Sequence, residues 1–154
     1  MAGKIIVESV TDALAVGSNI VDSAKNEIAW LLPPEMLIFA DQFGISEKIK
    51  IFIENGGRVR GITQITKTYH DVIRKLVDHG EEIRHVDHYQ GAFMLIADKK
   101  ESISSIYLDL EELSLDDELR AFWTDNEAYA DYLMSTFDFE WNGAVDAKKK
   151  LTEL

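Results

Sequence analysis

The sequence predicts a single α/β domain whose mixed, mostly parallel sheet carries helices on both faces. Three observations support this. Helical apolar patterns alternate with short apolar strands, a glycine follows two of the helices where extended chain resumes, and a polar four-residue loop separates two later apolar runs. A helix between two strands of one sheet implies a right-handed crossover and parallel strands. We expect the domain to cover residues 1–147, with a charged tail over 148–154 that frays.

The first elements are a helix, a strand and a short helix. Apolar residues spaced by three and four over residues 7–25 predict the N-terminal helix. The segment Glu27–Leu32 predicts a buried strand that Pro33-Pro34 ends, because proline cannot donate a ladder hydrogen bond. Pro34 suits the first turn of a helix through Met36–Gln42.

Two similar units follow, each made of a helix, a glycine and a strand. Gly56-Gly57 and Gly80 stand where a helix C-cap requires a left-handed residue. Because each unit returns the chain to the same sheet, its strand is expected to be parallel to the strand before it. The helical patterns cover residues 45–53 and 65–76, and the strands are Arg58–Thr63 and Glu82–Val86.

The last third of the chain predicts a hairpin, a strand and a long helix. The apolar runs Ala92–Ala97 and Ser102–Leu108 flank the polar turn Asp98–Glu101. Leu119–Trp123 predicts the last strand of the sheet. Thr124–Glu127 fits a capping box, which opens a helix that continues to Ala144.

Composition excludes several classes of function. The 16 basic and 28 acidic residues of the 154 give a net charge of −12, which opposes a broad nucleic-acid or anionic-membrane surface. The absence of cysteine excludes a disulfide framework, a thiolate zinc site and a thiol nucleophile. Met1–Lys4 does not begin a signal peptide and no apolar run is long enough to span a bilayer, so we expect a cytoplasmic protein with no membrane contact.

Four phrases carry a resemblance to a known family: IVDSAKNEIAWLLP, IENGGRVRGIT, GEEIRHVDHYQGAFMLIADKKESISSI and FWTDNEAYADYLMSTFDFEWNGA. Together with the element order from Val7 to Ala144, they resemble one half of the phospholipase D-like superfamily. The resemblance is closest to degenerate members that serve as C-terminal sensory domains of archaeal transcriptional regulators. It implies a phospholipase D-like half-domain with a regulatory role.

The family's catalytic motif, His-x-Lys-x4-Asp, is degenerate in this chain. With Asp98 in the place of the aspartate, the histidine position holds Gly91 and the lysine position holds Phe93. In the family, the histidine attacks phosphorus and the lysine holds the phosphate oxygens. Glycine and phenylalanine can do neither, so the resemblance implies the fold without catalytic residues.

Several polar residues are candidates for a ligand site. His85, Asp87 and His88 follow a predicted parallel strand, at the sheet edge where open α/β folds bind ligands. They could be a metal site, a displaced nucleophile, the lining of a pocket or a plain polar loop. Three nearby ligands are too few to predict a metal, so neither a metal nor a cofactor is expected. The full set of ligand-binding candidates at this rim is Gln64, Thr66, Lys67, His85, His88, Tyr89, Gln90, Trp123 and Thr124.

The sequence thus predicts a non-catalytic sensory or interaction domain of a transcription or signalling system. It would bind a small polar ligand or a regulatory protein, without direct contact to nucleic acid. We also expect a homodimer, because Phe93 and Met94 replace the polar motif with an apolar patch that suits a twofold contact. The alternative is a phosphodiesterase or nuclease with displaced catalytic residues, active as a homodimer.

Overall fold

The computed structural model describes residues 3–88, 92–105 and 118–154. Its strands are β1 (Lys4–Ser9), β2 (Glu27–Leu31), β3 (Arg58–Thr63), β4 (Glu82–His85), β5 (Met94–Ala97), β6 (Glu101–Ser105), β7 (Glu118–Thr124) and β8 (Val145–Asp146). Its helices are α1 (Val10–Ser23), α2 (Pro34–Gln42), α3 (Ile45–Glu54), α4 (His70–Asp78), α5 (Glu127–Gly143) and α6 (Ala147–Thr152), with a 3-10 turn η1 (Lys67–Tyr69) before α4.

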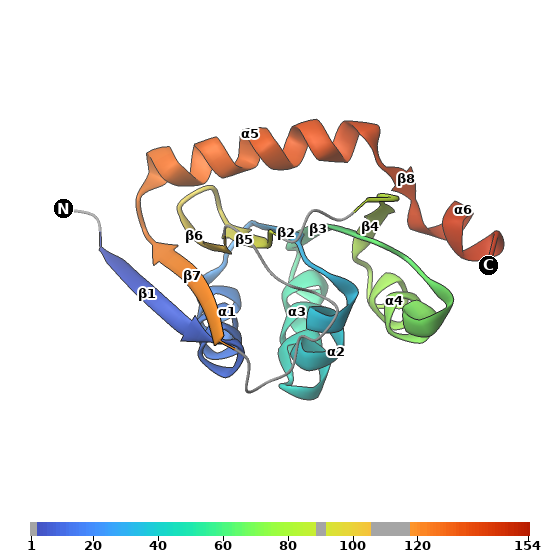
Figure 1. Cartoon of the computed structure of the whole chain (residues 1–154), viewed down its shortest axis with the longest axis horizontal. Coiled ribbons are helices and arrows are strands. Elements are labelled where there is room, and N and C mark those ends of the chain that lie inside the picture. The colour runs from blue at the N-terminus through green and yellow to red at the C-terminus, as the bar shows by residue number, and fades with distance from the viewer. Residues whose placement is uncertain (1–2, 89–91, 106–117) are drawn as a thin grey trace.

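The strands form one sheet in the order β1-β7-β6-β5-β2-β3-β4-β8. Helices α1 to α4 lie along one face, and the long helix α5 crosses the other (Figure 1). Each face has its own apolar core. The larger core joins α1 to α4 to the sheet, and the smaller one packs Leu133, Phe137 and Trp141 of α5 against Ile62 and Ile96. Helices on both faces are therefore confirmed.

The expectation of a mostly parallel sheet is wrong. Only β2 with β3 and β3 with β4 run parallel, while the remaining neighbours are antiparallel. The two helix–glycine–strand units produce the parallel part, with Gly56 at φ 97° and Gly80 at φ 104° after their helices. The turn after β5 reverses the chain, and β6, β7 and β1 continue the sheet in alternating directions.

The N-terminal helix starts later than residue 7. Lys4–Ser9 is a strand, and Ser9 caps α1 by accepting a hydrogen bond from the Asp12 N–H at 3.1 Å. Val7 and Val10 are both buried, so Val7 fits a helical stripe and an alternating strand equally well. The pairing of β1 with β7, which lies more than 100 residues away, decides between the two patterns.

The C-terminal part also differs from the prediction in detail. Asn126, not Thr124, caps α5 by accepting from the Tyr129 N–H at 3.0 Å. Residues 147–152 form α6 rather than a frayed tail, because Ala147 and Leu151 are buried in the larger core. Residues 106–108 of the predicted hairpin lie outside the described residues. In the part of the chain that the structure describes, no helix is long and apolar enough to cross a membrane.

Candidate functional site

Asp98, the aspartate of the degenerate motif, holds the turn between β5 and β6 onto the start of β2. Its carboxylate accepts hydrogen bonds from the backbone N–H groups of Lys25, Asn26 and Glu27 at 2.8, 2.8 and 2.9 Å. Partial burial works to raise the pKa of Asp98, but these donors outweigh it and hold the pKa below its usual range. Both oxygens of the carboxylate thus hold backbone N–H groups.

Phe93, at the lysine position of the motif, is buried. Only 2% of the residue is exposed, and its N–H donates to Ser105 Oγ at 3.0 Å. The prediction that Phe93 contributes an apolar surface patch is therefore wrong, because its ring packs within the larger core. Met94 is also buried and faces α5 in the smaller core. Gly91, at the histidine position, lies outside the described residues.

His85 is a structural residue of the β3–β4 rim. Its ring is 5% exposed, and its Nδ1 accepts from the Ile65 N–H at 2.9 Å. The proton therefore lies on Nε2, which faces Asp87 Oδ1 at 2.8 Å and donates to it. This hydrogen bond lowers the pKa of the Asp87 carboxyl. Because both ring nitrogens have partners, His85 is not available to a ligand.

The remaining rim candidates do not form one site. Gln64 is engaged, since its side-chain amide donates to the Asp87 carbonyl oxygen at 3.0 Å. Thr66 is half-buried, and Lys67 and His88 are exposed. His88 borders a hollow of about 170 Å³ beneath α5, between Leu31, Met94 and Glu140. Tyr89 and Gln90 lie outside the described residues.

Trp123 and Thr124 lie at the opposite rim of the sheet, so their predicted place beside Gln64 is wrong. Thr124 pairs with Ser102, at the start of β6, and the start of β6 in turn faces the end of β5. That end of β5 pairs with the start of β2, whereas the candidates beside Gln64 follow the ends of β3 and β4. Trp123 Nε1 donates to the Glu101 carboxylate at 3.0 Å. Since β7 runs antiparallel to β6, β7 ends at the edge of the sheet where β2 begins.

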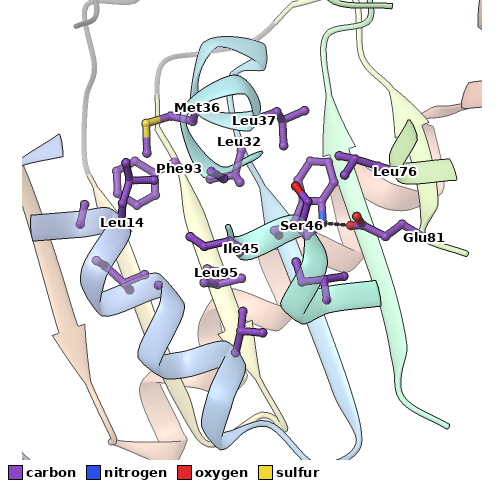
Figure 2. A pocket seen from close by; sticks show the side chains of 17 residues that line it. Leu14, Leu32, Met36, Leu37, Ile45, Ser46, Leu76, Glu81, Phe93 and Leu95 are labelled. Atoms are coloured by element: carbon purple, nitrogen blue, oxygen red, sulfur yellow. Dashed lines mark hydrogen bonds between the residues drawn. The ribbon is translucent and has the colours of Figure 1, made fainter. Parts of the chain in front are cut away.

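An apolar cavity of about 60 Å³ lies on the α1–α4 face of the sheet (Figure 2). It opens between α1, α2 and α3, and Phe93 and Leu95 of the motif segment contribute to its wall. Its seventeen lining residues are apolar apart from Ser46 and Glu81. Among the described residues, no group of three histidine, aspartate or glutamate side chains is placed to hold a metal ion.

Glu81 is the buried acid of this cavity, and the sequence analysis missed it. It is 4% exposed, and its Oε1 accepts from Trp30 Nε1 at 2.8 Å (Figure 2). Among the described residues, its Oε2 has no hydrogen-bond partner. Burial raises the pKa of Glu81 to about 7, although the Trp30 hydrogen bond works in the opposite direction. The available signal was indirect, because Gly61, a glycine inside a strand, marks the close approach of the Trp30 ring that Glu81 holds.

The fold is shared with solved structures of low sequence identity. TrmBL2, described as an archaeal chromatin protein with a novel mode of DNA binding, superposes with a TM-score of 0.72 at 16% identity over 94% of this chain. Nuc from Salmonella typhimurium, a phospholipase D family member, gives 0.72 at 13% identity, and NucT from Helicobacter pylori gives 0.73 at 12%. The chain has the phospholipase D-like fold.

The share of the matched chain that superposes differs between the two shorter chains, Nuc and NucT, and the longer TrmBL2 chain. The chain covers 98% of the Nuc chain and 99% of the NucT chain, but only 54% of the TrmBL2 chain. A phospholipase D-like unit of this size therefore occurs both as nearly a whole chain and as about half of a longer one. No protein-family model and no curated protein sequence matches this chain significantly.

The degenerate motif thus has two separate structural roles within the phospholipase D-like fold. Asp98 keeps the hairpin in place through backbone hydrogen bonds. Phe93, at the position of the phosphate-binding lysine, lines an apolar cavity.

Proposed function

We propose that this chain is a non-catalytic phospholipase D-like sensory or interaction domain of a transcription or signalling system. The observation that supports it is the burial of Phe93 in the wall of an apolar cavity, where the family's motif has a phosphate-binding lysine. An aromatic ring cannot neutralise the charge that develops on a phosphoryl group. The cavity has an apolar wall with one buried acid, a composition typical of small-molecule sites, and its volume of about 60 Å³ limits it to a ligand of a few heavy atoms.

The shared fold with TrmBL2 supports a regulatory setting, because the chain superposes on about half of that longer protein. Direct DNA contact is not part of the proposal. A net charge of −12 repels the phosphate backbone, which a DNA-binding surface must neutralise with basic side chains. The domain would instead pass ligand binding on to a partner protein or to a second copy of itself.

Hydrolysis assays test the loss of catalysis. We expect no turnover of bis-p-nitrophenyl phosphate, DNA or phosphatidylcholine above the buffer background. The loss of one oxyanion-stabilising donor typically costs about 10²–10³ in rate, and here the nucleophile is missing as well. Turnover that disappears in His88→Ala but persists in His79→Ala would overturn the proposal and support an enzyme with a displaced histidine.

A further inference from the structure

We propose that the cavity on the α1–α4 face binds a small apolar molecule that carries one ammonium group, with Glu81 as the acceptor of that group. This inference rests on the proposed function, since it names the ligand class of a non-catalytic binding domain. It is carried by the cavity wall, by the unsatisfied Glu81 carboxyl, by the position of Trp30 and by a glycine inside α1.

The wall of the cavity determines the body of the ligand. Leu14, Met36, Leu37, Ile45 and Phe93 are among its apolar residues (Figure 2). Of the two polar residues in the wall, Ser46 is already engaged, because its hydroxyl donates a hydrogen bond to the Asp41 carboxylate. Glu81 is therefore the polar group that remains for a ligand, and most of the ligand surface must be apolar.

Glu81 determines the charge of the ligand. Its carboxyl has one oxygen bound to Trp30 and one without a partner among the described residues. None of the ion pairs in the described part of the chain includes Glu81. A buried carboxylate without a cation is costly, and a cation within hydrogen-bond distance removes most of that cost. An ammonium group can donate to Oε2 and balance the charge in one contact, whereas an anionic ligand would add to the repulsion.

Trp30 supports the same class of ligand. Its indole lines the cavity and is fixed at two points. Its Nε1 donates to Glu81, and its ring lies so close to the Gly61 backbone that a Cβ there would stand 2.0 Å from the ring atoms. Trp30 therefore fixes the Glu81 carboxyl with one oxygen occupied, and leaves Oε2 as the acceptor for a second donor.

Gly17 indicates that the cavity has room for a ligand. It lies inside α1 and lines the cavity, where glycine costs helix stability relative to alanine. A Cβ at this position would have Leu95 Cδ2, at 3.5 Å, as its only near neighbour, which is an ordinary contact. Neither the backbone nor the packing therefore requires glycine here. Its absent methyl group leaves volume in the cavity.

The test is an NMR titration of the full chain with n-alkylamines from methylamine to propylamine, which suit a cavity of about 60 Å³, and with the n-alkanols of the same lengths, at pH 8. We expect saturable shifts of the amide signals of Gly17, Ser46 and Glu81 with the amines. The affinity should rise about fourfold for each added methylene until the cavity is full. The matched alkanols should bind at least tenfold more weakly, because they lack the charge-assisted hydrogen bond.

Three variants separate the contribution of the Glu81 charge from those of the cavity space and of the acidic surface. Glu81→Gln should weaken propylamine binding at least tenfold and remove the preference over propanol. Gly17→Ala should weaken both ligands, while the urea midpoint stays unchanged or rises. Glu82→Gln is the matched control, because Glu82 is an exposed neighbour that pairs with Arg58, and this variant should bind as the natural sequence does.

The proposal is overturned by an absence of saturable shifts, by propanol binding as tightly as propylamine, or by equal losses in the Glu81→Gln and Glu82→Gln variants. The last result would show that amines gather on the acidic surface. None of these results would restore catalysis, so the proposed non-catalytic function fails only through the hydrolysis assays. If Glu81→Gln does not fold, Gly17→Ala still tests the location of the ligand.

Discussion

At the turn between β5 and β6, the carboxylate of Asp98 gathers three backbone N–H groups from the segment that leads into β2. Asp98→Asn removes the charge and one acceptor oxygen, and asparagine tolerates the φ of 55° at this position. We expect a loss of about 1–3 kcal/mol in the free energy of unfolding at pH 7, measured by urea denaturation. Asp98→Ala should lose more, because alanine is strained in the left-handed region. A loss below 0.5 kcal/mol for both variants (roughly the size of a neutral surface substitution) would contradict this role.

The same carboxylate gives a pH dependence of known sign. Because the pKa of Asp98 is lowered in the folded state, its stabilisation is fully present above its unfolded pKa, about 3.9. It is lost as the pH falls through the lower pKa of the folded protein. The difference in unfolding free energy between the natural sequence and Asp98→Asn should therefore shrink below pH 4.

The raised pKa of Glu81 predicts a pH dependence of stability with the opposite sign, in a different pH range. Its pKa is raised from 4.5 to about 7, so the folded protein binds the proton more tightly than the unfolded chain does. The free energy of unfolding should fall by about 3 kcal/mol as the pH rises from 4.5 to 7, and stay level above. Glu81→Gln should lack this slope while keeping an acceptor for Trp30. Parallel pH profiles of the two proteins would contradict the prediction.

These residues also show what the sequence could and could not predict. Asp98 was placed at the turn from the apolar runs on either side of it, but its three donors lie more than 70 residues earlier and are backbone groups, which carry no sequence signal. His85 was a ligand candidate because histidine often binds ligands at a strand end, yet its ring is used by Ile65 and Asp87. Glu81 was overlooked because its burial depends on how α4 and β2 meet.

At the scale of elements, β2 and β3 lie together because Gly61 has no side chain opposite Trp30. Gly61→Ala would place a Cβ 2.0 Å from the indole ring, which Glu81 holds in place. We expect a destabilisation of about 1–3 kcal/mol or more, measured as the shift in urea midpoint at constant m-value. Gly17→Ala adds the same methyl group where there is room and should be neutral or stabilising by up to about 1 kcal/mol. Equal effects of the two variants would contradict the close packing at Gly61.

The order of elements was predictable where each element carries its own pattern. The glycine caps and the strand Arg58–Thr63 are found where the spacing put them, because they depend on local backbone preference and alternation. The start of the chain was not predictable in the same way. Lys4–Ser9 becomes a strand through its ladder with β7, and α6 is fixed by burying Leu151, so both depend on contacts distant in sequence.

At the scale of the whole molecule, the predicted and the observed strand directions differ. A helix between two strands fixes their direction, and this part of the prediction holds for β2, β3 and β4. The direction of β1 and β7 depends on which edge of the sheet each one joins, and no crossover helix in the sequence specifies that. The burial of Phe93 follows from the same arrangement, since α1 and α2 cover its side of the sheet.

The expected homodimer therefore needs a surface other than Phe93. The edge strand β1 offers one, because Ile5 and Ile6 are 54% and 66% exposed and, among the described residues, only β7 pairs with this strand. An unpaired strand edge with apolar side chains favours pairing with a second copy. Two copies at −12 repel each other, and salt screens this repulsion over about 8 Å at 0.15 M ionic strength. We therefore predict a dimer at moderate ionic strength that weakens as salt is removed, measured by sedimentation velocity.

Two substitutions test the surface of this dimer. Ile6→Thr keeps the β-branched shape but removes apolar area, and it should shift the protein toward the monomer of 17.5 kDa. Phe139→Gln removes a more exposed apolar side chain from α5 and should leave the dimer intact, because this half of α5 contacts β3 and β4, far from β1 in the strand order. A single 17.5 kDa species at high protein concentration and at every salt concentration would rule out the dimer. A dimer that survives Ile6→Thr and dissociates in Phe139→Gln would move the contact to α5.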